Sequence, residues 1–290
     1  MNDALRKSML TGMRIGAQYA LTAANRSPLG SAGEQLANRA GSSLEFMDHR
    51  DYQPGDDLRR INWSAYARTE KLTVKLFRQE VSPRLDIVID ASKSMGLGDS
   101  EKPNATVALA ALFASAANNA GFAYNTHLAG AGYQPVDGGR TSPENWRGID
   151  FDYDGNPDES FTRMPPVWPS RGIRVLISDL LWLGDPLTSL TQFGRDASAV
   201  VVVQLLARAD AQPPEHGNLR LIDSETGEPM EVFIDAIARQ RYEHNLAGHQ
   251  ENWRRAAMQS GAVMTTIIAE DLMDNWRLDD LLQTEILKVL

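Results

Sequence analysis

The chain has 290 residues, of which 42% are apolar, and this is enough to bury one large core or two modest ones. Its 29 basic and 38 acidic side chains give a net charge of -9, which repels phosphate backbones and argues against a nucleic-acid-binding role. The absence of cysteine excludes disulfides, thiolate metal sites and a cysteine nucleophile, so any metal has to bind oxygen or histidine.

Neither a secretory signal nor a membrane-spanning segment is evident in the sequence. The segment from Met9 to Ala24 is interrupted by Arg14 and Gln18, whereas a signal needs an unbroken apolar stretch. The most apolar run, from Ala197 to Ala207, is too short to span a bilayer. We therefore expect a cytoplasmic protein, and peripheral docking at a membrane stays open.

Residues 1–83 are expected to form an extension that precedes the main domain. Asp3 to Ala24 is predicted to be a helix, and the Gly, Ser and Asn-rich stretch from Asn25 to Ser43 a loop. Leu72 to Glu80 alternates apolar and polar residues, which is typical of a strand with one face in water.

Basic and aromatic side chains alternate within this extension, a combination that is also found where proteins stack on nucleic acids. Acidic residues are interleaved with them, and we favour internal ion pairing as their role. The basic and aromatic residues are Arg59, Arg60, Trp63, Tyr66 and Arg68.

Residues 84–290 show short apolar runs that alternate with helical stretches, which predicts a doubly wound, mostly parallel α/β sheet covered on both faces. Asn218 to Asp235 contains a turn signal and is predicted to be a hairpin that adds an antiparallel edge. Arg239 to Gln259 is predicted to be a surface helix. The predicted strands are Leu85–Ile89, Phe122–Ala129, Arg174–Ile177, Ala199–Leu206 and Val263–Ile268, with a helix at Asn104–Asn119 after the first.

The first of these strands ends in an Asp-x-Ser-x-Ser pattern formed by Asp90, Ser92 and Ser94. In an extended segment, side chains two residues apart point the same way, and ligands of open α/β sheets bind at the carboxyl ends of the strands. One carboxylate and two hydroxyls are hard oxygen donors that suit Mg²⁺ or Mn²⁺ and leave coordination positions for other ligands. Asp179 follows the third strand in the same way and is expected to bring a second carboxylate.

A purely structural role is the alternative for these residues. Asp90 would then cap the following turn and the serines would solvate the loop, as such residues often do. Because Asp179 stands at the corresponding place of a second strand, we favour the metal site.

The pattern resembles the metal-ion-dependent adhesion site (MIDAS) of von Willebrand factor A domains. In that site Asp-x-Ser-x-Ser is joined by a threonine and an aspartate from later loops, and the resemblance assigns the aspartate to Asp179. For the threonine it points to Thr141, with Ser142 as the alternative. The aspartate is followed by Leu180, where adhesion domains commonly have glycine.

A longer stretch of sequence resembles the domain-of-unknown-function family DUF58. The resemblance covers most of residues 40 to 270, and it implies a non-enzymatic, chaperone-like module that acts with a MoxR-type AAA+ ATPase. With Mg²⁺ bound, and with Mn²⁺ and Ca²⁺ as alternatives, the site would accept an acidic side chain from a client protein. The matching residues are Glu45-Phe46, Arg50, Tyr52, Pro54-Gly55-Asp56-Asp57, Arg59, Ile61-Asn62-Trp63, Ala67-Arg68-Thr69, Glu80, Leu221-Ile222-Asp223 and Glu225-Thr226-Gly227.

The sequence offers two other chemical interpretations, a calcium-binding loop and an enzyme active site. Asp150-x-Asp152-x-Asp154-Gly155 copies the start of a calcium-binding loop, but Phe161 stands where the twelfth-position glutamate belongs, so a solvated acidic loop is favoured. A Mg²⁺-dependent hydrolase or phosphotransfer enzyme that uses Asp90 and Asp179 is the rival function. It would need a general base at the site, such as His127.

Overall fold

The computed structural model describes residues 2–22, 44–79, 84–162, 168, 171–213, 216–222 and 228–290. These residues form two units, of which residues 44–79 are the smaller. Residues 2–22 belong to the larger unit, so the boundary expected at residue 83 does not hold for the start of the chain.

The smaller unit is a two-stranded antiparallel sheet with a short helix. Asn62 caps the helix by accepting a hydrogen bond from the backbone N–H of Ala65 at 3.1 Å. Arg50 pairs with Asp56 at 2.6 Å, and Arg59, one of the interleaved basic residues, lies 3.6 Å from Asp57. The elements are β2 (Leu44–Asp51), η1 (Leu58–Arg60), α2 (Trp63–Thr69) and β3 (Thr73–Gln79), and β3 confirms the strand predicted there.

The larger unit is built on a six-stranded, mostly parallel sheet with the order β11-β8-β7-β4-β5-β6. Only β6, at one edge, is antiparallel to its neighbour. Chain order reverses between β4 and β7, since β5 follows β4 on one side and β7 pairs with it on the other. The strands are β4 (Arg84–Asp90), β5 (Ala123–Gly130), β6 (Gly132–Pro135), β7 (Ile173–Ser178), β8 (Ala199–Leu206) and β11 (Val263–Ile268), and they confirm the five strands predicted for a mixed α/β sheet.

The predicted hairpin is present, but it does not extend this sheet. Its strands β9 (Gly217–Ile222) and β10 (Pro229–Ile234) pair with each other as a separate two-stranded sheet. Most of the turn predicted between them, residues 223–227, lies outside the described residues. The antiparallel edge of the main sheet is β6 instead, because the chain turns back directly after β5.

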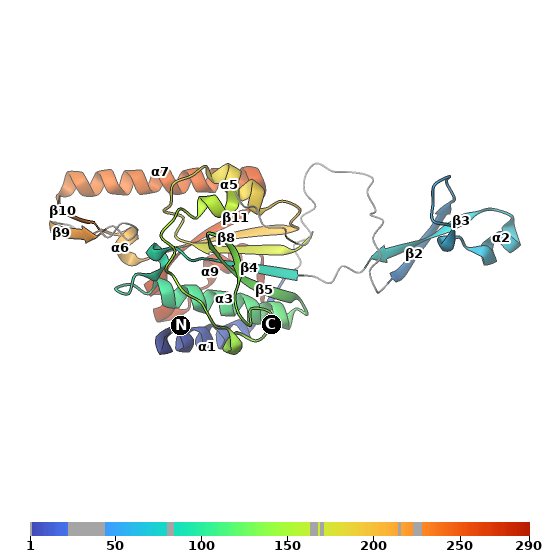
Figure 1. The fold of residues 1–290 in the computed structure, drawn as a ribbon, viewed down its shortest axis with the longest axis horizontal. Helices are drawn as coiled ribbons and strands as arrows, with labels where there is room; N and C mark the ends of the chain where they lie inside the picture. Colours follow the sequence, from blue (N-terminus) through green and yellow to red (C-terminus); the bar gives the residue numbers. More distant parts are fainter. Residues whose placement is uncertain are drawn as a thin grey trace. The chain divides into compact units, whose positions relative to one another are not determined.

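Helices cover both faces of the sheet (Figure 1). One hydrophobic core joins the sheet to α1, α3, α8 and α9, and a second joins its other face to α4, α5 and α7. The helices are α1 (Asp3–Gly16), α3 (Lys102–Asn119), α4 (Asp158–Thr162), α5 (Pro186–Phe193), α6 (Arg208–Ala211), α7 (Ala236–Ser260), α8 (Ala269–Asn275) and α9 (Asp279–Gln283), with short 3₁₀ turns η2 (Lys93–Gly96) and η3 (Pro143–Asn145).

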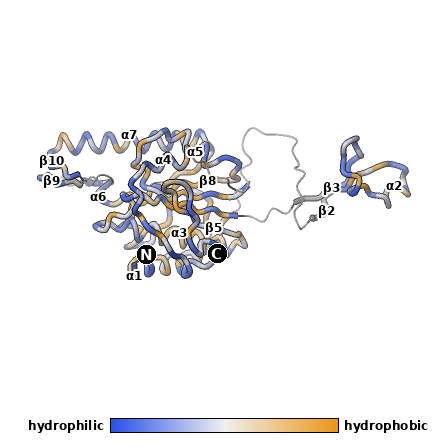
Figure 2. Tube along the Cα trace, viewed as in Figure 1, coloured by the Kyte–Doolittle hydropathy of each residue, from blue (hydrophilic) through white to orange (hydrophobic). Residues whose placement is uncertain are grey.

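Helix α3 is the centre of the first core. It is rich in alanine and buried on nearly all sides, because it lies between the sheet and α1. Figure 2 shows hydrophobic residues gathered around α3 and β8. Close approach of α1 requires glycine, since a Cβ atom at Gly12 would lie 2.0 Å from the carbonyl oxygen of Ala108.

The first helix ends earlier than its sequence pattern predicts. It was expected to reach Ala24, but it ends at Gly16, and β1 (Tyr19–Leu21) follows. This strand pairs antiparallel with β12 (Leu287–Val289) near the other end of the chain. Pairing with a segment so distant in sequence overrides the local helical pattern.

Candidate functional site

The Asp-x-Ser-x-Ser segment lies where β4 leaves the sheet. Asp90 ends this strand and is buried, with 1% of its surface exposed. The backbone N–H of Ser92 donates to Asp90 Oδ1 at 2.8 Å, so Asp90 also has the loop-stabilising role of the structural alternative. The chain then enters η2, and this places Ser92 Oγ and Ser94 Oγ 3.1 Å apart.

The end of β7 contacts the end of β4 through a buried hydrogen bond. Ser178 Oγ donates to Asp90 Oδ2 at 2.6 Å and also accepts from the indole N–H of Trp182 at 3.1 Å. Asp179, the next residue, is likewise 1% exposed. The structure thus brings Asp90, Ser92, Ser94 and the Asp179 loop to the same end of the sheet, at the position where strand order reverses.

A buried lysine reaches this cluster from the first turn of α3. Lys102 Nζ lies 3.1 Å from Asp179 Oδ2 and 3.0 Å from Asp210 Oδ2, and the lysine is 1% exposed. Asp179 Oδ1 accepts from the backbone N–H of Leu181 at 3.1 Å, so both oxygens of this carboxylate have donors. The sequence analysis does not single out Lys102. The signal that could have identified it is a lysine at the start of a helix that is otherwise rich in alanine.

The two buried carboxylates differ in their charge environment. Burial, followed by the charge of Asp179, raises the pKa of Asp90 to about 6, although hydrogen bonds from Ser178 and Ser92 act in the opposite direction. Burial lowers the pKa of Lys102, but the charges of Asp179 and Asp210 outweigh it, and the pKa lies above its ordinary value. The lysine therefore neutralises Asp179, while no ammonium or guanidinium group of the described residues forms an ion pair with Asp90.

The donor set is compatible with a small divalent cation. Adjacent ligands of an octahedral Mg²⁺ at 2.0–2.1 Å lie about 3 Å apart, and the two serine oxygens at 3.1 Å have this spacing. The described residues contain no group of three or more acidic or histidine side chains placed to hold a metal, so an ion here would depend on hydroxyl ligands. Because Asp179 already binds Lys102, it fits a charge-balancing role better than that of a direct ligand.

The threonine that the resemblance assigned to the site lies elsewhere. Thr141 lines a cavity together with Arg84 and Ala123, which are the first residues of β4 and β5, and Ser142 lines it too. Asp90 is at the other end of β4, so the structure does not bring Thr141 or Ser142 to it. The reason is that the loop after β6 folds back along β5, as the hydrogen bond from Tyr124 Oη to the carbonyl oxygen of Thr141 shows.

A different loop lies beside the cluster. The backbone N–H of Lys93 donates to the carbonyl oxygen of Tyr153 at 2.9 Å, and the N–H of Tyr153 donates to that of Ala91 at 3.1 Å. This is the acidic loop that copies the start of a calcium site, and its three aspartates are exposed. Within the described residues, these aspartates belong to no group of three or more carboxylate or imidazole side chains that could hold a metal. Lys93 Nζ approaches Asp154 at 3.7 Å.

The general base that the rival enzyme function would need is also elsewhere. His127 Nε2 lies 2.8 Å from the amide nitrogen of Asn125 and 3.7 Å from Asp86 Oδ1. In the register of β4 and β5, His127 stands opposite Val88, whereas Asp90 stands opposite Ala129. The imidazole thus belongs to a polar cluster nearer the amino end of the strand.

Comparison with known proteins identifies the family. The family model of the protein of unknown function DUF58 matches residues 48–252, more than two thirds of the chain. The chain belongs to the DUF58 family. Uncharacterized proteins of Mycobacterium bovis and Mycobacterium tuberculosis are 27% identical to this DUF58 chain over 255 residues, which cover 81% of the chain and 78% of each relative.

Solved structures resemble this DUF58 protein more remotely. The conserved hypothetical protein BatB from Bacteroides thetaiotaomicron matches 70% of the chain and 98% of its own length, with 10% identity and a TM-score of 0.37. An aerotolerance-related membrane protein from Bacteroides fragilis matches 69% of the chain and 98% of its own length, with 11% identity and the same TM-score. In the part of the chain that the structure describes, no helix is both long enough and apolar enough to cross a membrane.

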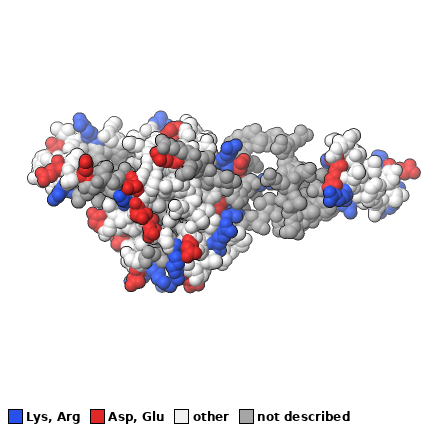
Figure 3. Space-filling view, in the orientation of Figure 1, with Lys and Arg blue, Asp and Glu red and all other residues white. Residues whose placement is uncertain are grey.

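Acidic and basic side chains are interspersed on the face of the larger unit that Figure 3 shows. The described side chains on this face form no continuous basic surface.

Proposed function

We propose that this DUF58 protein is a non-enzymatic binding module that holds Mg²⁺ with Asp90, Ser92 and Ser94 and uses the ion to bind a partner protein. The proposal is carried by one observation. The buried carboxylate of Asp90, which forms no ion pair with a described residue, lies at the start of the loop whose two serine oxygens are 3.1 Å apart. Hydrogen bonds from Ser92 and Ser178 compensate this carboxylate only in part, since burial still raises its pKa to about 6, and a bound cation would compensate it further.

Strand topology supports a likeness to von Willebrand factor A domains. The helices that follow β4 and β7, α3 and α5, pack in different cores on opposite faces of the sheet, and in doubly wound sheets such a reversal forms a crevice at the carboxyl ends of the strands. Such crevices are the usual ligand sites of doubly wound sheets. Asp90 follows one of these strands and Asp179 the other, as the adhesion-site pattern requires.

In this proposal each side chain has a separate task. The ion supplies Lewis acidity, which accepts a carboxylate oxygen from the partner. Ser92 and Ser94 orient the ion, and Asp90 balances its charge from within the sheet. Lys102 holds Asp179 in place and neutralises its charge, so that Asp90 and Asp179 are not both buried as unpaired negative charges.

The partners proposed are a client protein that presents an acidic side chain and a MoxR-type AAA+ ATPase. The first follows from the vacant coordination positions that three protein ligands leave on an octahedral ion. The second rests on membership of the DUF58 family and is an expectation from that resemblance. No observation favours the rival hydrolase, because His127 is bonded away from Asp90.

Isothermal titration calorimetry with MgCl₂ tests the metal site. We expect saturable binding to the unaltered chain, and at least tenfold weaker binding to Asp90→Asn and to the double variant Ser92→Ala, Ser94→Ala. Thr141→Ala is the matched control, because this residue fits the sequence pattern but lies at the other end of the sheet, and its binding should be unchanged. Equal Mg²⁺ binding by all variants, or none by the unaltered chain, would refute the site.

A second experiment tests the use of the ion. Capture of an immobilised glutamate-rich peptide should require Mg²⁺, be abolished by a chelator and be lost in the double serine variant. If the variant binds Mg²⁺ poorly but captures the peptide normally, the metal has no part in binding. Turnover of phosphate esters that disappears in Asp90→Asn would favour the enzyme instead.

A further inference from the structure

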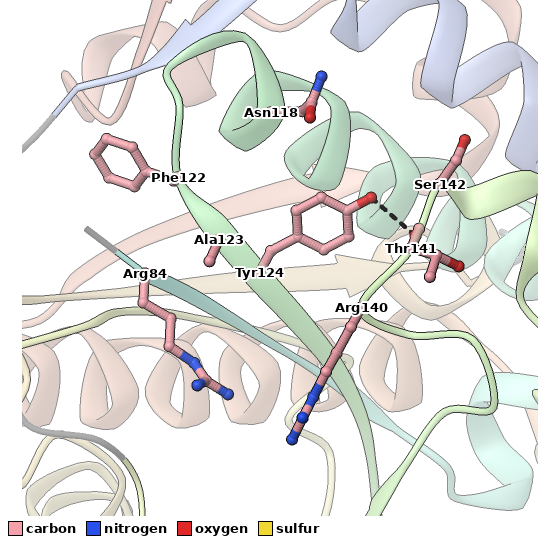
Figure 4. A pocket seen from close by; sticks show the side chains of 8 residues that line it. All are labelled: Arg84, Asn118, Phe122, Ala123, Tyr124, Arg140, Thr141 and Ser142. Atoms are coloured by element: carbon pink, nitrogen blue, oxygen red, sulfur yellow. Dashed lines mark hydrogen bonds between the residues drawn. The ribbon is translucent and has the colours of Figure 1, made fainter. Parts of the chain in front are cut away.

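A cavity of about 410 Å³ lies at the amino ends of β4 and β5, the opposite end of the sheet from Asp90. Its walls come from the start of these two strands, the end of α3 and the loop that follows β6 (Figure 4). This volume falls in the range of about 300 to 1,000 Å³ that is usual for small-molecule sites.

The charged side chains that line the cavity are both arginines, in a chain whose net charge is -9. Arg84 Nε lies 3.2 Å from the fully buried Asp86 Oδ1, and this contact holds the arginine while its two terminal nitrogens have no hydrogen bond to a described residue. Arg140 forms no ion pair with any residue that the structure describes. In Figure 4 the two side chains extend in the same direction, on either side of Tyr124.

The wall that carries Arg140 is fixed by hydrogen bonds. The carbonyl oxygen of Thr141 accepts from Tyr124 Oη at 2.8 Å and from the indole N–H of Trp146 at 3.0 Å. Thr141 Oγ1 donates to the carbonyl oxygen of Gly138 at 2.8 Å, and Gly138 adopts a φ of 74°, which favours glycine. A site on a fixed loop loses less entropy on binding than one on a loop that must first be ordered.

These bonds also determine what the cavity can offer a ligand. The hydroxyl protons of Tyr124 and Thr141 are already donated, and Ser142 Oγ donates to Met13 Sδ at 3.6 Å. The lining keeps two charged donors, the guanidinium groups, and one neutral side-chain donor, the amide of Asn118. Guanidinium groups pair best with phosphate and carboxylate, to which they donate two parallel hydrogen bonds. Phe122 and the ring of Tyr124 add an apolar surface.

We propose that this cavity binds a small molecule that carries a phosphate or carboxylate group. The anionic group lies between Arg84 and Arg140, and the rest of the molecule packs against Phe122 and Tyr124. The site is independent of the proposed metal site, since the two lie at opposite ends of β4.

Titration of the full chain with inorganic phosphate, citrate and adenosine monophosphate tests this site. Each is followed by calorimetry and by amide chemical shifts at constant ionic strength, and the three probes separate phosphate from carboxylate recognition. We expect saturable binding of at least one, with shift changes confined to residues 84, 118–124 and 138–142. Arg140→Glu should weaken binding by roughly tenfold or more, because it removes charge-assisted hydrogen bonds.

Arg255→Glu is the matched control, since it makes the same charge change on α7. There the exposed Arg255 lies 3.8 Å from Glu251 and donates to Asn252 Oδ1 at 2.6 Å, and it takes no part in the cavity. It should bind the probe as the unaltered chain does. Three results would overturn the proposal: no saturable binding of any probe, equal binding by Arg140→Glu, or equal loss in both variants. Because Arg140 is exposed, we expect Arg140→Glu to fold normally. Thermal unfolding of both variants checks that each is folded.

Discussion

Replacement of Lys102 by methionine distinguishes two explanations of the buried cluster: a site that binds a metal ion, or a network of ion pairs that is stable without one. The ammonium group is buried and lies 3.1 Å from Asp179 and 3.0 Å from Asp210. Removing one partner of a buried ion pair typically costs about 3 to 5 kcal/mol, because a charge stays behind without compensation. For a unit of this size we expect the melting temperature to fall by about 6 to 20 °C in chelator.

Magnesium should then recover part of this loss. In Lys102→Met, Asp179 joins Asp90 as a buried carboxylate without a basic partner, and the site attracts a cation more strongly. A ligand at a hundred times its dissociation constant stabilises the folded state by about 2.7 kcal/mol. We expect 10 mM MgCl₂ to stabilise the variant by at least about 1 kcal/mol more than the unaltered chain, which corresponds to roughly fivefold tighter binding.

Urea unfolding in chelator and in MgCl₂, at matched ionic strength, measures both effects. Asp210→Asn is the control, because it removes the more exposed partner of Lys102 and leaves the contact with Asp179 in place. Its response to Mg²⁺ should match that of the unaltered chain. Equal stabilisation of Lys102→Met and the unaltered chain by Mg²⁺ would show that freeing Asp179 adds nothing to cation binding, and the reasoning would be refuted.

Two further predictions concern the helix layer and the pH dependence of folding. Gly12→Val should destabilise the chain by about 3 kcal/mol in urea unfolding, because its Cβ would lie 2.0 Å from the Ala108 carbonyl oxygen. Gly248→Ala should instead stabilise α7 by about 1 kcal/mol, because the new Cβ meets no neighbouring element within 4 Å. Equal effects of the two substitutions would contradict the close packing of α1. The raised pKa of Asp90, about 6 against an ordinary 3.8, means that the folded state binds the proton more tightly than the unfolded state. The contribution of Asp90 to the stability of the folded state is therefore fully present below pH 4 and is lost as the pH rises through 6. In chelator, we expect the free energy of unfolding to fall by about 1 kcal/mol more in the unaltered chain than in Asp90→Asn between pH 5 and 7. The same slope in both proteins would show that Asp90 is not the group responsible.

Local sequence patterns predicted the central strands well. Apolar runs such as the one that ends at Asp90 have few alternatives to a buried strand, and β8 and β11 have the predicted bounds. The end of β4 was predictable for the same reason, because Asp90, Ser92 and Ser94 are neighbours in the chain. Their placement depends on one turn, and that turn is local.

What could not be predicted depends on contacts between distant segments. The pairing of β1 with β12 joins residues about 270 positions apart, and nothing in Tyr19–Leu21 alone indicates it. The resemblance to adhesion sites assigns Thr141 to the metal site from its position along the sequence. In the structure, the loop that carries Thr141 is hydrogen-bonded to Tyr124 at the opposite end of the sheet. Spacing along a long loop does not determine the direction in which the loop folds.

Lys102 makes the charge environments of Asp90 and Asp179 unequal. Sequence reasoning treated Asp90 and Asp179 as an equivalent pair, but the structure gives one of them an internal cation and leaves the other without one. If the network needed no ion, a second basic side chain near Asp90 would be the simplest way to compensate it, and no described residue supplies an ion pair there. The two serine hydroxyls are hydrogen-bonded to each other at 3.1 Å, and two adjacent ligands of one Mg²⁺ would have the same spacing. We therefore propose that Asp90, which hydrogen bonds alone hold, takes up a cation that comes and goes with a partner, while Lys102 keeps Asp179 neutralised.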